Sequence, residues 1–271
     1  MKPIKVLTIA GSDSGGGAGI QADLKTFQEL EVFGMSAITA ITAQNTLGVQ
    51  GVYPLSLEAV ANQIDSIGTD IGADAVKTGM LFNSEMIQLV CDKIQQYQWD
   101  NVVVDPVMIA KGGASLLQEE AVKTMREKLI PLSKVITPNI PEAEALTGKT
   151  IQSMEDRQEA AKLLHQLGAQ NVVIKGGHDL NSDQVVDLLF DGTEFTTYKS
   201  KRIHTNNTHG TGCTFAAAVA SQVAKGKTII DAVGIAQRFV HMSIVNSMQI
   251  GSGHGPLNHA AHRTVGVNHN V

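Results

Sequence analysis

The chain has 271 residues, 43% hydrophobic and 17% charged, so it is long enough to bury one large core or two modest ones. Its formal net charge of -5 offers no positive field for a nucleic-acid backbone, which argues against nucleic-acid binding. The two cysteines, Cys91 and Cys213, cannot form a disulfide framework and are expected to be free thiols. The apolar stretches are far shorter than the ~20 residues of a membrane-spanning helix. Because the first residues show no secretory signal, we expect a cytoplasmic protein that makes no membrane contact.

Short apolar runs rich in β-branched residues recur along the chain, and each ends at a turn or a polar residue. Such runs are typical of strands that are buried on both faces of a sheet. They cover residues 6–10, 37–42, 75–78, 102–105, 135–137 and 172–175. Stretches of helical period separate them, and the predicted helices span 57–68, 84–98, 119–129, 154–167, 213–225 and 229–246.

A further helix is predicted between the first two strands. Its apolar residues fall three or four positions apart and share one face, namely Ile20, Leu24, Phe27 and Leu30. Asp23, Lys25 and Glu29 are predicted to point away from that face. The segment therefore has the pattern of a crossover helix between two parallel strands.

The alternation of strands and helices predicts a three-layer α/β/α fold, in which a mostly parallel sheet carries helices on both faces. Residues 1–271 are predicted to form a single domain, because no linker or repeat interrupts them. One break in the rhythm is a hairpin of residues 185–190 and 194–199 around Asp191 and Gly192, which predicts an antiparallel edge. The last residues, 251–271, lack periodicity and are expected to lie along the surface.

A glycine-rich loop follows the first predicted strand, at the sheet edge where open parallel sheets bind their ligands. Its glycines let backbone N–H groups come close to a ligand, although a turn that binds nothing is the simpler alternative. Gly17, Gly19 and Ala22 fit the dinucleotide-binding fingerprint, but no acidic residue follows in the next strand region to hold a ribose. A Walker A loop is excluded because no Gly-Lys-Ser/Thr sequence follows the glycines.

A second glycine-containing segment precedes the Ala-rich helix near residue 213. The backbone N–H groups of Gly210, Thr211, Gly212 and Cys213 lie at the start of this helix, where they are predicted to bind an oxyanion. The helix dipole is expected to lower the pKa of the Cys213 thiol and to make it a proton acceptor. A buried structural cysteine is the alternative.

A third candidate site follows the strand at 135–137. Asn139 is predicted to cap a helix that Pro141 begins, with Glu142 in its first turn. Asp105 ends a preceding strand, so its carboxylate is expected near the same edge of the sheet. A few oxygen ligands of this kind, partly acting through water, can hold a magnesium ion that is bound mainly by phosphates.

Six motifs in the same order resemble the hydroxymethylpyrimidine/phosphomethylpyrimidine kinases of thiamine biosynthesis. They are AGSDSGGGAGIQAD at 10–23, KTGM at 77–80, VDPV at 104–107, TPNxxEA at 137–143, IKGGH at 174–178 and HGTGCT at 209–214. The resemblance extends from about Val6 to Pro256. It implies a ribokinase-like fold, ATP and Mg²⁺ as cofactors, and a homodimer. Whether a monovalent cation is also needed is left open.

The resemblance also implies roles for individual residues. The substrate pocket maps to Gly11, Ala18, Asp23, Gln44 and Met80. The nucleotide and metal apparatus maps to Asn139, Lys175, Thr211, Asp105 and Glu142, with Mg²⁺ held partly through water, and the anion hole maps to residues 210–213. An amide such as Gln44 can donate and accept at once, which matches the ring nitrogen and amine of an aminopyrimidine. A surface lysine is the alternative for Lys175, and a backbone-bonded loop histidine is the alternative to phosphate contact for His209.

The function implied by the resemblance is phosphorylation of an aminopyrimidine alcohol, and then of its monophosphate, with ATP. Cys213 would take the proton of the alcohol. A pyridoxal or pyridoxine kinase on the same fold is the nearest alternative, followed by a non-catalytic regulator that binds the vitamin precursor. A dehydrogenase is a distant third possibility. The histidines at 254, 259, 262 and 269 match no zinc-site spacing, so we expect no transition metal.

Overall fold

The strands form one mixed sheet in the computed structural model, which describes residues 3–108, 119–177 and 183–267. The order across the sheet is β3-β2-β1-β4-β5-β6-β7-β8-β9. The strands are β1 (Lys5–Asp13), β2 (Phe33–Asn45), β3 (Gly48–Pro54), β4 (Ala75–Thr78), β5 (Val102–Val104), β6 (Val135–Ile136), β7 (Asn171–Ile174), β8 (Gln184–Phe190) and β9 (Phe195–Lys201). All neighbours from β2 to β7 pair in parallel, which confirms the predicted sheet.

Both edges of the sheet are antiparallel. The predicted hairpin is confirmed as β8 and β9, which join the sheet through an antiparallel pairing of β8 with β7. The other edge strand, β3, was not predicted, because residues 48–54 hold two glycines and a terminal proline and read as a loop. Strand β2 is also longer than predicted, so Gln44 lies inside β2 beside a register shift rather than after it.

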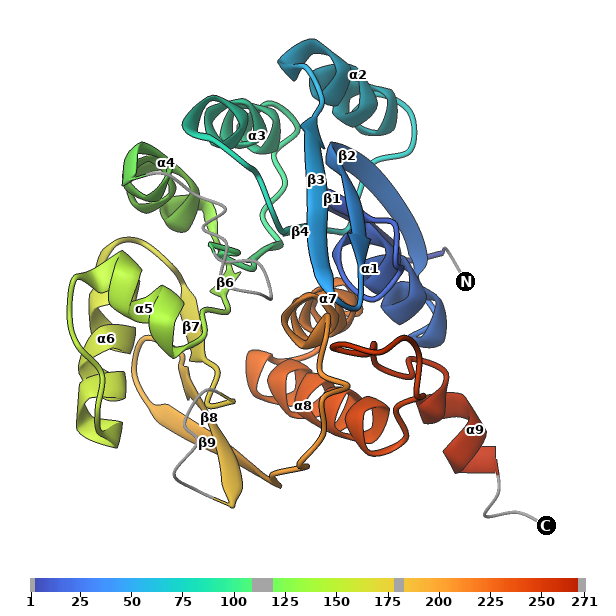
Figure 1. The fold of residues 1–271 in the computed structure, drawn as a ribbon. Coiled ribbons are helices and arrows are strands. Elements are labelled where there is room, and N and C mark those ends of the chain that lie inside the picture. Colours follow the sequence, from blue (N-terminus) through green and yellow to red (C-terminus); the bar gives the residue numbers. More distant parts are fainter. Residues whose placement is uncertain (1–2, 109–118, 178–182, 268–271) are drawn as a thin grey trace.

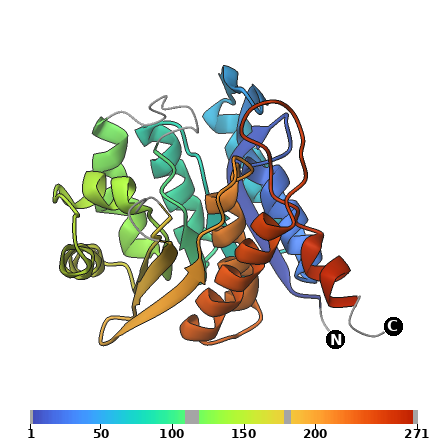
Figure 2. The same cartoon turned by 60° about the horizontal axis from the view of Figure 1, so that its bottom comes forward.

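Helices cover both faces of the sheet, as predicted (Figure 1). They are α1 (Gly19–Glu29), α2 (Leu57–Gly68), α3 (Ser84–Gln96), α4 (Glu119–Thr124), α5 (Ile140–Thr147), α6 (Met154–Gln166), α7 (Thr211–Ala224), α8 (Ile229–Val245) and α9 (Ala261–Val267). One layer is formed by α2 to α6, and the opposite layer by α1, α7 and α8 (Figures 1 and 2). The predicted helix over 119–129 is only partly α-helical, since residues 125–129 form a π-helical turn and a 3₁₀ turn follows.

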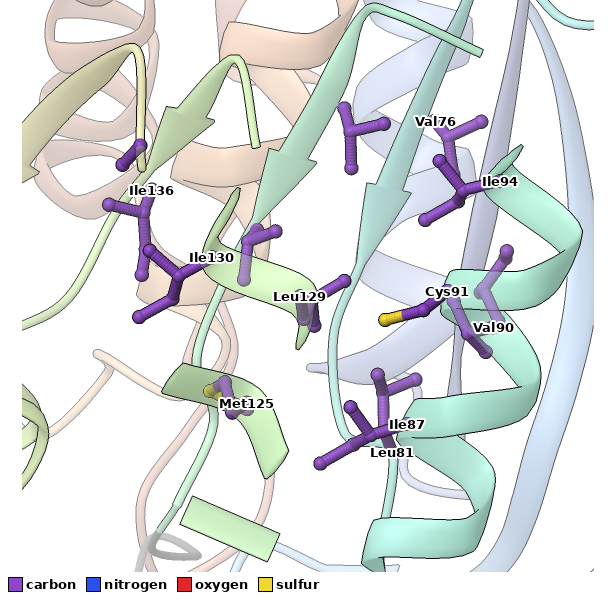
Figure 3. Close-up of a cluster of buried hydrophobic side chains, with 14 of the residues drawn as sticks. Val76, Leu81, Ile87, Val90, Cys91, Ile94, Met125, Leu129, Ile130 and Ile136 are labelled. Carbon is purple, nitrogen blue, oxygen red and sulfur yellow. The ribbon is translucent and has the colours of Figure 1, made fainter. Parts of the chain in front are cut away.

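Each face of the sheet has its own apolar core. Figure 3 shows part of the core under α2 to α6, where Ile87 and Cys91 of α3 lie opposite Leu129. The opposite core contains Phe27, Phe239 and the alanines of α7, whose small side chains let that helix lie close to the sheet. Each fully buried Leu, Ile or Phe side chain contributes about 1.5–3 kcal/mol through its removal from water. These two cores hold the carboxyl ends of the parallel strands in register, which positions the site below.

The segment after α8 does not simply lie on the surface. Residues 253–259 run back to the sheet edge, where the His209 N–H donates to the Gly255 carbonyl and the His254 N–H donates to the Thr46 carbonyl. His178 of the IKGGH motif and the C-terminal His269 lie outside the described residues. Within the described parts of the chain, helices are too short or too polar to span a bilayer. Both cysteines are free thiols, as predicted.

Candidate active site

A cavity of about 580 Å³ opens at the carboxyl ends of the parallel strands. This is the edge where open α/β sheets bind ligands. All the predicted site residues except Asp23 line it, namely Gly11, Ala18, Gln44, Met80, Asp105, Asn139, Glu142, Lys175, Gly210, Thr211, Gly212 and Cys213. Seven separate segments of the chain thus meet in one space.

The start of helix α7 forms the floor of the cavity. Gly210 caps the helix with φ +84°, and an added Cβ there would lie 1.8 Å from the Gly17 carbonyl oxygen, so only glycine fits this close approach. Thr211 directs its hydroxyl to the Thr208 carbonyl at 2.7 Å. The first N–H groups of any helix lack an acceptor inside the helix, which leaves this turn able to bind a phosphate.

Cys213 lies in this first turn, and its environment corrects one expectation. Burial raises the pKa of the Cys213 thiol to about 11, whereas the Lys77 ammonium and the Gly19 N–H act in the opposite direction. The pKa is therefore not lowered as predicted, because loss of solvent outweighs the Lys77 ammonium and the Gly19 N–H. In this structure Cys213 is a protonated thiol at neutral pH.

Asp23 is a second correction. It was predicted to point away from the buried face of its helix and to belong to the substrate pocket, but its side chain is completely buried behind the cavity. Its carboxylate accepts from the Thr8 hydroxyl at 2.6 Å and from the Lys77 ammonium at 2.9 Å. Burial disfavours the charged ammonium, but the attraction of Asp23, Cys213 and Asp105 together outweighs it and raises the pKa of Lys77. The Asp23 carboxylate thus helps to keep the Lys77 ammonium charged near Cys213.

A cluster of charged side chains lies on the other side of the helix α7 start. Lys175 Nζ contacts Asp105 Oδ1 at 3.0 Å, and the Lys175 side chain is only 14% exposed, so the surface-lysine alternative is wrong. An added Cβ on Gly212 would lie 3.2 Å from Lys175 Nζ, which places this cation at the helix start. Lys175, Asp105 and Glu142 together give the cavity one cation between two carboxylates.

Asn139 and Glu142 begin helix α5 as predicted. They form a capping box, in which the Asn139 side chain accepts the Glu142 N–H at 2.9 Å and Glu142 Oε2 accepts the Asn139 N–H at 2.8 Å. Burial raises the pKa of Glu142 to about 7, although Lys175 acts in the opposite direction. Glu142 can therefore change its protonation state near neutral pH.

The opposite end of the cavity is apolar and holds Gln44. An added Cβ on Gly11 would lie 2.5 Å from Met80 Cε, so the missing side chain leaves room for the methionine. Val49 and Val52 of β3 complete this wall, and sequence reasoning missed both because it missed the strand. The space between them and Ala18 suits a flat, largely apolar ring with polar atoms facing Gln44.

Helix α8 adds residues that were also missed. Gln237, Val240, His241 and Ile244 line the cavity, and their spacing of three, one and three residues is one face of a helix. The helix itself was predicted, and this spacing was the signal that could have marked its face. Asp13 and His209 likewise line the cavity, 2.9 Å apart.

The described histidines of the C-terminal segment lie in different environments. His259 is buried and contacts the Thr214 hydroxyl at 2.9 Å, whereas His254 and His262 are exposed. Across the residues that the structure describes, His, Cys, Asp and Glu nowhere gather in a group of three or more that could hold a metal ion.

The phosphomethylpyrimidine kinase family matches residues 13–258. The chain belongs to this family. A hydroxymethylpyrimidine/phosphomethylpyrimidine kinase of Bacillus subtilis is 59% identical over 268 residues, covering 99% of each chain. The enzyme of the same name from Haemophilus influenzae is 53% identical over 262 residues, covering 95% of this kinase and 97% of its relative.

Solved structures agree with this fold. An ADP complex of Bacillus subtilis pyridoxal kinase superposes on this kinase with a TM-score of 0.92 at 45% identity, covering 97% of this chain and 100% of the relative. The ribokinase-like architecture expected from the motifs is therefore confirmed.

Proposed function

We propose that this kinase transfers the γ-phosphate of ATP to 4-amino-5-hydroxymethyl-2-methylpyrimidine and then phosphorylates the monophosphate to the pyrophosphate. One observation carries the proposal: a single cavity joins a phosphate-binding helix start beside a thiol to an apolar ring site that ends at an amide. The first element suits phosphoryl transfer. The second suits an aminopyrimidine, whose edge offers one donor and one acceptor.

The α7 start and Lys175 would neutralise the phosphate oxygens. Charge spreads over these oxygens during transfer, so preorganised N–H groups and a nearby ammonium stabilise the transition state most where the charge develops. Burial disfavours the Lys175 ammonium, but Asp105 and Glu142 outweigh it and raise the pKa of Lys175, which keeps it charged. When the nucleotide arrives, Lys175 can turn from Asp105 toward phosphate.

Asp105 and Glu142 fit a magnesium ion. They offer two carboxylates at the mouth of the nucleotide side, which is the small set of oxygen ligands expected when phosphates and water complete the shell. When bound, Mg²⁺ would neutralise charge on the phosphates and help align them. The shared Lys175 would move from one carboxylate as the metal binds.

Cys213 would take the proton of the attacking alcohol in its thiolate form. The alcohol oxygen forms a bond to the γ-phosphorus, the bond from phosphorus to the ADP oxygen breaks, and the alcohol proton passes to sulfur. The Lys77 ammonium, held by its ion pair with Asp23, favours the Cys213 thiolate by electrostatic attraction. In a loose transition state the alcohol need not lose its proton before attack, so a small thiolate population can suffice.

Pyridoxal is a second candidate substrate. A solved pyridoxal kinase is 45% identical to this chain and shares its fold. The ring pocket and the anion site suit either ring-shaped alcohol, so the amide of Gln44 is the group that favours the aminopyrimidine. A preference for pyridoxal would therefore conflict with the main proposal.

The decisive experiment incubates the protein with MgATP and each alcohol and counts the added phosphates by mass spectrometry. We expect one and then two phosphates on the aminopyrimidine alcohol, with a higher kcat/KM than for pyridoxal. A higher kcat/KM for pyridoxal would overturn the assignment. Binding of the alcohol without consumption of ATP would instead favour a non-catalytic regulator.

We also propose a homodimer. Large apolar side chains are exposed along the β2–β3 edge, including Leu47 at 71% and Tyr53 at 62%. An exposed sheet edge of this kind is suited to pairing with a second chain.

A further inference from the structure

His209 occupies a junction that phosphate binding does not explain. Its N–H donates to the Gly255 carbonyl, and it forms an isolated β-bridge with Pro256. Its ring lies against the glycine-rich loop, since an added Cβ on Gly17 would lie 2.5 Å from His209 Cδ2. The backbone of His209 and one side of its ring are thus held by two distant segments of the chain.

Asp13 determines which ring nitrogen of His209 carries a proton. The Asp13 carboxylate accepts N–H groups from Gly15, Gly17 and Ala18 at 2.8–3.0 Å, and it lies 2.9 Å from His209 Nε2. Burial would raise the pKa of Asp13, but the hydrogen bonds from His209 and Ala18 outweigh it and lower the pKa. An ionised carboxylate can only accept, so His209 Nε2 must donate.

This donor faces the amide of Gln44. Gln44 Nε2 lies 3.1 Å from His209 Nε2, and Gln44 Oε1 lies 3.2 Å from the Thr42 hydroxyl. In that orientation the Gln44 Nε2–H groups and the His209 Nε2–H face each other, and neither nitrogen can accept a hydrogen bond. The Thr42 hydroxyl hydrogen is also engaged, because it donates to the Ser12 carbonyl at 2.8 Å.

A half-turn of the amide resolves both conflicts. The Gln44 oxygen then shares the single His209 Nε2–H with the Asp13 carboxylate in a three-centre hydrogen bond. The Gln44 nitrogen donates to the Thr42 oxygen, which can accept while its own hydrogen stays on Ser12. Each of the four groups then has a partner of the right kind. One N–H and one lone pair of the amide stay available for a ligand in the cavity.

We propose that the Asp13–His209 pair fixes the orientation of the Gln44 amide, which makes His209 a specificity-determining positioning residue. The inference rests on the proposed function. The ring carbon that carries the hydroxymethyl group is next to the ring carbon that carries the amine. Placing the alcohol at Cys213 therefore fixes the order in which the amine and the ring nitrogen meet Gln44. An amide held in one orientation matches one order, whereas a freely turning amide does not discriminate.

The experiment compares the aminopyrimidine alcohol with the same alcohol lacking the amine. The measured quantity is the ratio of their kcat/KM values, called here the amine discrimination. We expect His209→Phe to reduce the amine discrimination at least about tenfold, mainly through a higher KM for the amino substrate, because the Gln44 amide loses its fixed partner. His209→Gln is the matched control, since its Nε2 can replace the histidine donor, and it should retain discrimination within about threefold.

Gln44→Met supplies the test that a merely structural role would not pass. In a Gln44→Met background, His209→Phe should leave the amine discrimination unchanged, because the residue through which it acts is gone. If His209→Phe does not fold beside Gly17, His209→Asn replaces it, since its shorter side chain cannot reach Gln44.

Two results would overturn the inference: equal loss of kcat/KM for both substrates, or the same effect of His209→Phe with and without Gln44. If the unaltered enzyme does not phosphorylate the aminopyrimidine alcohol, the proposed function fails and the inference fails with it. Turnover by the unaltered enzyme combined with undiminished discrimination in His209→Phe would refute the positioning role alone.

Discussion

Cys213 shows that the chemistry of a residue depends on its surroundings more than on its place in a motif. Its position at a helix start suggested a low pKa, but burial raises the pKa to about 11. Two effects of opposite sign act on the same thiol, and loss of solvent is the larger. The thiolate is therefore a minor species at neutral pH, and its population increases with pH.

This gives a prediction for the single-turnover rate of phosphoryl transfer. Because the thiolate fraction rises almost tenfold per pH unit well below the pKa, the rate should rise steadily from about pH 6 to 9. Cys213→Ala should lower the rate at least about 100-fold and remove the rise, with the substrate KM little changed. Quench-flow measurements on both proteins check this.

Cys213→Ser provides the control for volume and polarity. A flat rate between pH 6 and 9 in the unaltered enzyme would show that the thiolate is not the base. The Asp23–Lys77 pair would then be a purely structural element of the core.

At the scale of elements, two helices begin with the same device for different purposes. Asn139 and Glu142 form a capping box at α5 inside the cavity, and Ser153 and Asp156 form one at α6 away from it. The sequence predicted the Asn139 cap and a helix that begins at residue 154, and an oxygen-bearing side chain at the N-cap satisfies a free backbone N–H at each start. The position of each helix along the sheet determines which of the two caps lies in the cavity.

The two caps make a matched pair for mutation. Asn139→Ala and Ser153→Ala should each lower the free energy of unfolding by about 1 kcal/mol, as N-cap losses do. Asn139→Ala should also raise the KM for MgATP about tenfold, because it frees Glu142 beside the proposed metal position. Urea denaturation and steady-state kinetics measure the two effects. A kinetic defect in Ser153→Ala, or none in Asn139→Ala, would remove Asn139 from the site.

On the scale of the whole molecule, residues 253–259 connect the β2–β3 edge of the sheet to helix α7, whose first turn lines the cavity. His259 contacts the Thr214 hydroxyl, one residue after Cys213. Burial lowers the pKa of His259 to about 4 from its ordinary 6.5. The folded protein therefore holds a neutral histidine that becomes charged on unfolding at mildly acidic pH.

The sign of the pH dependence follows directly. Between about pH 6.5 and 4 the unfolded chain binds a proton at His259 that the folded chain does not, so stability falls as the pH falls. The loss reaches at most about 3 kcal/mol. His259→Gln should remove this part of the acid sensitivity in urea titrations, whereas His254→Gln, at an exposed side chain, should not. Equal acid sensitivity in all three proteins would contradict the role of His259.

The sequence alone determined the local elements and most of the site. Buried parallel strands read as continuous β-branched runs, caps have short-range signatures, and glycine-rich anion sites are contiguous in the chain, so residues such as Asn139 and Gly210 could be predicted. The parallel order also follows from alternation, because crossover helices leave few other topologies.

Only the tertiary structure decided what depends on contacts between distant segments. The burial of Asp23 against Lys77, the raised pKa of Cys213 and the Asp13–His209–Gln44 contacts each depend on partners between 54 and 196 positions apart in the chain. Charge and hydrogen bonding in a cavity depend on solvent exclusion and on distances of a few ångströms. Neither solvent exclusion nor these distances can be predicted from local sequence, because both arise only when the sheet brings the strand ends together.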